Sequence, residues 1–196
     1  MNQLIALINS LVTLTGDETE QLRSLSKQTT LERNEIFMKQ RERCPKLAFL
    51  LTGSFRCFYT TADGEEVNTE FIITEGFITD FISYSRKAES QVSIQALERS
   101  DIIVLDFHST AIGNELRAKL RVLSTRYINK VCLPVLRDYQ LIMAENASHR
   151  YELLVQKYPD YIQRIPQKHI ASYLRLRPET ISRIRKKFLD LNQLVA

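Results

Sequence analysis

The spacing of apolar residues changes twice along the chain and divides it into three stretches. Up to about residue 34 the spacing is helical and predicts two helices, the second capped by Asp17. From about Glu35 to Phe107, short apolar runs rich in β-branched and aromatic residues predict an antiparallel sheet of short strands. Beyond Phe107 the helical spacing returns. The pattern therefore predicts an α+β protein whose sheet is flanked by helical segments.

The predicted strands are short apolar runs separated by turn signals. They include LAFLLTG, FRCFYT, EEVNTEFII, SIQALE and DIIVLDF. Asp63-Gly64 lies between the second and third of these runs, and this dipeptide is a strong local signal for a hairpin turn.

An apolar seam runs along the first helix after the sheet. Its members are Ile112, Leu116, Leu120, Leu123, Tyr127 and Val131. We favour a coiled-coil-like contact between two copies of the chain, and packing of the seam on the sheet stays open as the alternative. Pro134 removes a backbone donor, so we expect a kink or break near residues 130–134. Helical spacing then resumes from Leu136 to Val155 and ends before Pro159.

Composition limits the class of protein. The 196 residues, 44% of them hydrophobic, suffice for one large or two small domains. No apolar run is long enough to span a membrane, and the N-terminus has neither a basic leader nor a small-residue cleavage site. Cys44, Cys57 and Cys132 are too widely spaced for a disulfide framework or a zinc site, so we expect free thiols in a cytoplasmic protein with no metal and no membrane partner.

Positive charge is concentrated near the C-terminus. Eight basic residues and one acid lie between Arg164 and Lys187, so this segment carries +7 in a chain whose net charge is +4. The rest of the chain therefore sums to −3. A basic segment of this kind is typical of an element that binds a polyanion, although a solvated helix face has the same composition.

Two short helices fit the basic segment, roughly Gln167 to Leu174 and Pro178 to Phe188. Their apolar faces predict that they pack together, with small Ala171 allowing a close crossing and Leu176 filling the turn between them. Pro178 suits the first residue of a helix. This pattern predicts a helix-turn-helix that enters the major groove of double-stranded DNA.

The second of these helices exposes side chains that suit base edges. Glu179 can accept a hydrogen bond from cytosine, Arg183 can donate two to guanine, and Ser182 shares their face. A further group is better placed for phosphates, which give affinity without sequence information. Its members are Gln167, Lys168, Arg177, Thr180, Lys186 and Lys187.

The motif IASYLRLRPETISRIRKK resembles IA-x-YLG-x-x-x-ETLSR, the signature of the Crp/Fnr family of bacterial transcription regulators. Upstream, RYELLVQKYP is similar to the family segment between the dimer helix and the DNA-binding domain. LLTGSFRCFYTTADGEE resembles the opening of the family's cyclic-nucleotide-binding fold, and EGFITDFISY followed by SIQALE resembles its ligand cassette. The resemblance covers nearly the whole chain.

This resemblance implies three parts. An N-terminal antiparallel β-roll of the cyclic-nucleotide-binding type spans 1–111, a dimerisation helix and hinge span 112–145, and a helix-turn-helix domain spans 146–196, with the boundary between about 140 and 150. The resemblance implies a homodimer that binds a near-palindromic operator, with half-sites about one helical turn apart, and that contacts RNA polymerase. It also gives Glu179 and Arg183 the base-reading positions.

The sequence departs from the family pattern within the helix-turn-helix. Arg175 replaces the usual glycine of the turn, so we expect a non-glycine residue at positive φ. Pro178 replaces the arginine that usually opens the recognition helix, which removes one potential guanine contact. The chain also ends soon after this helix, which leaves little room for a C-terminal wing.

The departure in the ligand pocket is larger. Family members that bind cyclic nucleotides hold the phosphate with an Arg-Ser pair, whose positions here are Ser90 and Gln91, and the ribose with a glutamate, whose position is Asp80. Without the arginine a buried phosphate loses its bidentate partner, so we expect no tight binding of cAMP or cGMP. Together with Ser83, these residues are candidates for the pocket of an unknown small-molecule effector, or they are surface residues.

The sequence identifies no cofactor. It lacks the N-terminal cysteine cluster of iron–sulfur members, and no haem-binding pattern stands out. A metal-dependent enzyme on a small β-barrel would need clustered ligands, whereas His108, His149 and His169 lie in different predicted elements, so we expect no catalysis. A constitutive regulator, whose sheet domain serves only as a dimerisation platform, stays open beside an effector-controlled one.

Overall fold

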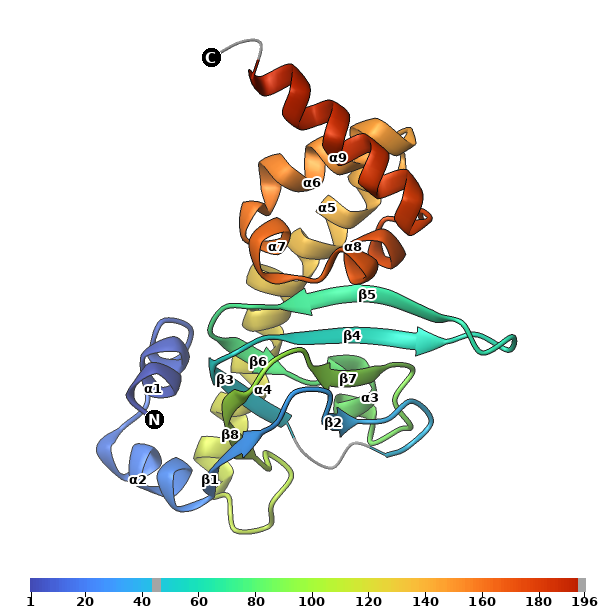
Figure 1. Ribbon diagram of the computed structural model, residues 1–196. Coiled ribbons are helices and arrows are strands. Elements are labelled where there is room, and N and C mark those ends of the chain that lie inside the picture. The colour runs from blue at the N-terminus through green and yellow to red at the C-terminus, as the bar shows by residue number, and fades with distance from the viewer. Residues whose placement is uncertain (44–46, 194–196) are drawn as a thin grey trace.

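The computed structural model describes residues 1–43 and 47–193, with side chains as far as Lys187 (Figure 1). It opens with two helices, α1 (Asn2–Asn9) and α2 (Gly16–Ser24). The expected cap at Asp17 is wrong, because Thr15 is the N-cap of α2 and forms a capping box with Glu18, three residues later. The Thr15 hydroxyl accepts from the Glu18 N–H at 3.3 Å, and the Glu18 carboxylate accepts from the Thr15 N–H at 2.7 Å.

Two four-stranded antiparallel sheets face each other in the middle of the described chain (Figure 1). One sheet has the order β1 (Ser26–Leu31), β8 (Ser100–Leu105), β3 (Leu47–Thr52) and β6 (Gly76–Ile78). The other has the order β2 (Ile36–Met38), β7 (Ser93–Ala96), β4 (Phe55–Thr60) and β5 (Glu66–Ile72), and α3 (Phe81–Arg86) follows β6. Apolar side chains such as Phe49, Phe55 and Ile94 fill the space between the sheets.

Each of the five runs named from the sequence contains a strand, so the predicted antiparallel sheet is confirmed. The hairpin at Asp63-Gly64 is also confirmed: it joins β4 to β5, and Gly64 takes a φ of +83° that favours glycine. β1 was not predicted, because its sequence SKQTTL is polar and it pairs at the sheet edge with β8 only.

A long helical segment crosses behind the sheets (Figure 1). It consists of α4 (Asn114–Tyr127), a π-helical turn labelled η1 (Ile128–Cys132), and α5 (Leu133–Met143). The predicted seam is buried in the core of the sheet domain, at Ile112, Leu116, Leu120, Leu123 and Tyr127, and only Val131 is exposed. The favoured interpretation of this seam as a dimer contact is therefore wrong, and its packing on the sheet is right.

The irregularity expected near residues 130–134 is confirmed as a π-helical turn directly before Pro134. The N–H of Leu133 bonds to the carbonyl of Ile128, five residues earlier. Pro134 has no N–H to bond to the carbonyl four residues before it, and one wider turn accommodates this loss without ending the helix.

Four helices complete the described chain: α6 (Ala147–Lys157), α7 (Pro159–Arg164), α8 (Gln167–Tyr173) and α9 (Pro178–Gln193). The helix predicted through to Val155 is interrupted between α5 and α6, where the Asn146 side chain accepts from the N–H of His149 and caps α6. α7 was not predicted; it begins at Pro159, where we expected helical structure to have ended.

The C-terminal helices share their core with the sheet domain. Phe71, Ile73 and Leu97 come from the sheet domain and pack with Tyr161 and Tyr173 of the helices. Figure 1 shows the result, with α8 lying directly along β5. No helix among the described residues is long and apolar enough to cross a membrane.

Candidate DNA-binding interface

α8 and α9 form the predicted helical pair. α8 ends one residue earlier than expected, and α9 runs on to Gln193. Ile170 and Ala171 on α8 and Ile181 on α9 are buried, and Leu176 packs against the same core, as the apolar pattern predicts. The two helices therefore cross closely at a small residue, which fixes the direction in which α9 presents its outer face.

The turn between these helices contains Arg175 at a φ of +57°, which confirms the expectation of a non-glycine residue at positive φ. The Arg175 guanidinium donates a hydrogen bond to the Tyr59 hydroxyl at 3.1 Å and lies 5.7 Å from the centre of that ring. The positive φ strains the backbone at Arg175, and the contacts of its side chain with Tyr59 on β4 offset part of that strain.

The outer face of α9 gathers the three predicted base-reading residues. Glu179, Ser182 and Arg183 are exposed and line a shallow depression together with Gln167 and Lys186. Pro178 completes the rim at the first turn of the helix. The structure thus brings an acceptor, a hydroxyl and a guanidinium onto one accessible surface.

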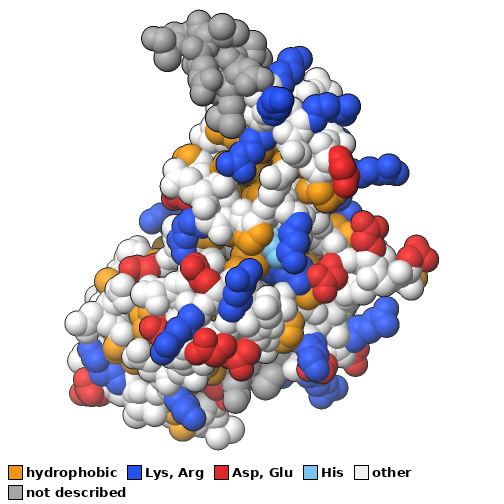
Figure 2. Space-filling view, in the orientation of Figure 1, with side chains coloured by type: hydrophobic (Ala, Val, Ile, Leu, Met, Phe, Trp, Pro, Cys, Tyr) orange, Lys and Arg blue, Asp and Glu red, His pale blue; other side chains and the backbone are white. Residues whose placement is uncertain are grey.

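The predicted phosphate-binding residues surround this depression. Lys168, Arg177, Lys186 and Lys187 are exposed, whereas Gln167 and Thr180 are half-buried. Figure 2 shows lysine and arginine side chains gathered over the part of the molecule that α8 and α9 form. Within the described residues, none of the charged side chains of this surface forms an ion pair.

The opposite face of α8 is hydrogen-bonded to β5. The Asn68 N–H donates to the Ser172 hydroxyl at 3.0 Å, and that hydroxyl donates to the carbonyl of Glu66 at 3.0 Å. Ser172 therefore extends the hydrogen bonding of the β5 edge into the helical domain.

Arg56 forms the centre of this contact. It is only 5% exposed, its guanidinium pairs with the Glu66 carboxylate at 2.6 Å and donates to Gln95 at 2.7 Å, and it lies 3.9 Å above the Phe58 ring. The same guanidinium approaches His169 Nδ1 at 3.5 Å. A buried cation with several partners holds the helical domain at one position on the sheet.

His169 lies on this inner face of α8, not on the surface that we expect to meet DNA. Burial, together with the positive charges of Arg56 and Lys168, lowers the pKa of His169 to about 4. The histidine is therefore neutral at physiological pH. Sequence reasoning missed this cluster, and the available signal was Arg56, a charged residue inside the apolar run FRCFYT.

Arg164, which the charge count placed in the basic segment, also belongs to the domain contact. Its guanidinium donates to the carbonyls of Ile73 and Gly53 and pairs with Glu98 at 2.9 Å. Next to it, the Tyr161 hydroxyl donates to the carbonyl of Phe71 at 2.9 Å. Arg164 is thus committed to the sheet domain and adds little to a DNA-binding surface.

The four candidate effector-pocket residues lie together and bond to one another. The Asp80 carboxylate accepts from the Ser83 N–H and hydroxyl at 3.1 and 2.7 Å, from the Ser90 hydroxyl at 3.2 Å and from the Gln91 N–H at 3.1 Å. Burial raises the pKa of Asp80, but these hydrogen bonds outweigh it, so the pKa lies below its ordinary value. Ser83 and Ser90 are buried, and Gln91 is exposed.

The histidines and cysteines are dispersed. His108 follows β8, His149 is on α6 and His169 is on α8. The described residues contain no group of histidine, cysteine and acidic side chains placed to hold a metal ion. Cys57 and Cys132 are free thiols, and Cys44 lies outside the described residues.

No protein-family model and no curated protein matches the sequence, whereas solved structures match its fold. The c-di-GMP-responsive global regulator CLP of Xanthomonas campestris matches with a TM-score of 0.66 at 13% identity, over 91% of this chain and 93% of that one. A putative Crp/Fnr-family transcriptional regulator of Eubacterium rectale matches with a TM-score of 0.65 at 17% identity, over 96% and 88%. FixK2 of Bradyrhizobium japonicum matches with a TM-score of 0.64 at 14% identity, over 85% and 86%. The chain therefore has the fold of Crp/Fnr regulators, as the motif resemblance implied.

Proposed function

We propose that this protein is a sequence-specific DNA-binding transcription regulator of the Crp/Fnr type and not an enzyme. One observation carries the proposal: the exposed face of α9 presents Glu179, Ser182 and Arg183 over one depression, within a basic surface that has no internal ion pairs among the described side chains. Arg183 reads guanine and Glu179 reads cytosine, while the surrounding lysines bind phosphate. The likeness of the fold to that of transcription regulators supports this assignment.

The regulator acts as a homodimer through the long helical segment. Although the predicted seam is buried, another face of this segment leaves large apolar side chains in water. Leu133, Leu136 and Leu141 on α5 are 49%, 51% and 52% exposed, and Val122 on α4 is 43% exposed. Most of the large hydrophobic residues that are exposed in the described chain lie on this segment, and such a surface is typical of a protein–protein contact.

The dimer has a direct test. Leu133→Lys combined with Leu136→Lys should shift the sedimentation coefficient to that of the monomer, because two charges would enter the apolar contact. Ile82→Lys is the matched control, since Ile82 is 66% exposed but lies on α3. A dimer that survives the double substitution would place the contact elsewhere.

A dimer with two recognition helices requires a near-palindromic operator, with half-sites about one helical turn apart. Selection of random duplex DNA by the purified protein, without ligand, should therefore enrich a palindrome. Enrichment of an asymmetric site would overturn the dimeric arrangement. Failure to enrich any site, with and without candidate effectors, would overturn the DNA-binding assignment.

Neither cAMP nor cGMP controls this regulator. The Asp80 carboxylate is already occupied by hydrogen bonds from Ser83, Ser90 and Gln91, and among residues 1–43 and 47–187 no cationic side chain joins this cluster to pair with a phosphate. Addition of cAMP or cGMP should leave the melting temperature unchanged, since a ligand that binds only the folded state must raise it.

The protein regulates its promoters through contact with RNA polymerase, which a pull-down of polymerase on operator DNA would detect.

A further inference from the structure

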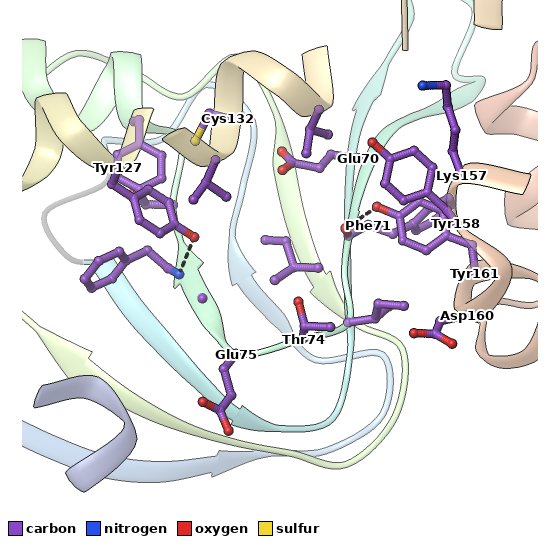
Figure 3. A pocket seen from close by; sticks show the side chains of 18 of the residues that line it. Glu70, Phe71, Thr74, Glu75, Tyr127, Cys132, Lys157, Tyr158, Asp160 and Tyr161 are labelled. Atoms are coloured by element: carbon purple, nitrogen blue, oxygen red, sulfur yellow. Dashed lines mark hydrogen bonds between the residues drawn. The ribbon is translucent and has the colours of Figure 1, made fainter. Parts of the chain in front are cut away.

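A cavity of about 260 Å³ lies where three parts of the chain meet (Figure 3). The end of β5 and the start of β6 form one wall, the π-helical turn and the start of α5 form another, and the junction of α6 and α7 forms the third. The hydrogen-bonded cluster of Asp80, Ser83, Ser90 and Gln91 does not line this cavity, so the two sites are distinct. A molecule bound here would contact the sheet, the long helical segment and the DNA-binding domain at once.

Glu70 enters this cavity from β5 (Figure 3). Side chains alternate along a strand, so Phe71 packs into the C-terminal core while Glu70 faces the other side, toward the turn that carries Cys132. Within residues 1–43 and 47–187, no side chain donates a hydrogen bond to the Glu70 carboxylate or forms an ion pair with it. An acid is therefore partly buried without a partner.

Burial raises the pKa of Glu70 to about 7. Burial raises the pKa values of Tyr127, Cys132, Tyr158 and Tyr161, and the nearby Glu70 carboxylate adds a smaller increase to each. The lysine among the lining residues, Lys157, pairs at 2.8 Å with Asp138, which does not line the cavity. Among the side chains that the structure describes, the carboxylate thus lacks the positive charge that would offset its desolvation.

Three tyrosines line the cavity and are fixed through their hydroxyl groups (Figure 3). The Tyr127 hydroxyl accepts from the Phe77 N–H at 3.0 Å, and the Tyr161 hydroxyl donates to the carbonyl of Phe71 at 2.9 Å. The Tyr158 hydroxyl donates to Asp138 at 2.9 Å, and its ring stacks on Tyr161 at 4.9 Å between centroids. The rings are therefore held in place before any ligand binds, which lowers the entropic cost of binding.

We propose that this cavity is a binding site for a small organic ammonium ion, whose charge pairs with the Glu70 carboxylate and whose alkyl groups lie against the tyrosine rings. Aromatic rings attract such cations through their negative faces, and the attraction is stronger where water is excluded. Glu75 and Asp160 also line the cavity and add negative charge, which disfavours a phosphate or a nucleotide. The volume of about 260 Å³ lies just below the roughly 300–1,000 Å³ of drug-sized ligand sites, so the cavity is limited to a small amine.

Calorimetric titration of the full-length protein at pH 8 tests this site directly, with butylammonium and tetramethylammonium as probes. We expect saturable binding of both ions to one site per chain. 1-Butanol should bind at least tenfold more weakly than butylammonium, and butyrate should not bind, because the first lacks the charge and the second reverses it. Lowering the pH to 6 should weaken the binding of both ions, since protons then compete for Glu70.

Glu70→Gln keeps the shape of the side chain and removes its charge, so it should weaken butylammonium binding at least tenfold. The variant leaves no cation unpaired, and an unchanged circular dichroism spectrum would verify its fold. Glu65→Gln is the matched control, because Glu65 is exposed in the turn of the same hairpin. The proposal is wrong if neither ammonium ion saturates, or if Glu70→Gln binds butylammonium as tightly as the parent protein.

The regulatory consequence rests on the proposed function. Residues of both the sheet domain and the helical domain line the cavity, so a bound cation favours the arrangement in which the two domains are in contact as described above. If that arrangement and one with the domains apart differ in DNA affinity, the cation must change the DNA affinity of the protein. Butylammonium should therefore change the affinity of the parent protein for its selected operator and not that of Glu70→Gln. Calorimetry without DNA and operator binding without ligand are separate measurements, so failure of one proposal is distinguishable from failure of the other.

Discussion

The inner and outer faces of the helical pair α8–α9 differ in how their polar groups are paired. On the inner face, His169 and Ser172 meet Arg56 and Asn68 in a buried network whose groups satisfy one another. On the outer face, Arg183 and its neighbours stand in solvent, without ion pairs among the described residues. The inner face therefore docks the helical pair on a buried charge of the sheet domain, whereas the outer face keeps its own charges in solvent.

This difference shows why charge count alone misleads. Paired and buried charges position a domain, and their energies appear in stability. Unpaired exposed charges contribute little to stability and remain available to an anionic partner. Arg164 and Arg183 illustrate the contrast, because both lie in the same basic segment and only Arg183 is free for DNA.

The largest effect on the inner face should come from Arg56→Ala. Its loss leaves Gln95 and Asn68 without their charged partner inside the contact, and we expect the free energy of unfolding to fall by about 2–3 kcal/mol. Urea denaturation measures this change. Arg86→Ala, at an exposed position on α3, is the control and should change stability by less than about 0.5 kcal/mol. Equal losses for the two variants would mean that the Arg56 network does not hold the domain.

Acidification should weaken the inner face through His169. The folded-state pKa of about 4 lies below the unfolded value of about 6.5, so the folded protein binds fewer protons across that window. Stability due to this group is present above pH 6.5 and is lost as the pH falls toward 4. Between pH 7 and 5, we expect the free energy of unfolding of His169→Gln to fall by about 1–2 kcal/mol less than that of the parent protein, as urea denaturation at the two pH values would measure.

Glu70 titrates in the opposite sense and must be separated from His169. Its raised pKa of about 7 means that its contribution is present at low pH and is lost as the pH rises through 7. The quantity to compare is therefore the free energy of unfolding of the parent protein minus that of His169→Gln at each pH, because the contribution of Glu70 cancels in this difference. An unchanged profile for His169→Gln would contradict the role of His169.

On the outer face, Lys187→Ala should have a smaller and uniform effect. Removal of one phosphate contact should weaken binding to all duplexes alike and reduce the salt slope of log K by about 1. A filter-binding titration over several salt concentrations measures both quantities. Lys27→Ala removes the same charge from β1, far along the chain from α9, and should leave the slope unchanged. A weakening confined to one DNA sequence would reassign Lys187 to base reading.

The smallest effect concerns the turn that joins the two faces. Arg175→Gly relieves the positive φ but loses the hydrogen bond to Tyr59, so its stability should stay within about 0.5 kcal/mol of the parent protein. Arg175→Ala loses the same hydrogen bond and keeps the strain, so it should be about 1 kcal/mol less stable than Arg175→Gly. Thermal unfolding of the two variants checks this order, and equal stabilities would show that the turn is unstrained.

The outer face could be predicted from sequence because its information is local. Helical spacing, Pro178 at a helix start and the placement of Glu179 and Arg183 on one face all depend on residues close together in the chain. The strand runs and the hairpin at Gly64 were predictable for the same reason. The positive φ at Arg175 followed from a single position in the motif.

The inner face could not be predicted because it joins residues about a hundred positions apart. Arg56 and His169 are separated by 113 positions, and no periodicity of either segment indicates that they meet. The burial of Leu120 and Tyr127 against the sheet was not the favoured prediction for the same reason, since the apolar seam alone also fits a contact between two copies. Glu70 required the fold as well, because only the meeting of three segments creates its cavity.

The central claim, that α9 reads DNA, is tested most directly by Arg183→Ala on the selected operator and on a scrambled duplex of the same composition. We predict a loss of about 1–3 kcal/mol on the operator, roughly tenfold to a hundredfold in affinity, with relaxed specificity at one base pair. The loss on the scrambled duplex should be no larger than that of Lys187→Ala. Equal losses of Arg183→Ala on both duplexes would contradict base reading by α9 and reduce the surface to a general polyanion contact.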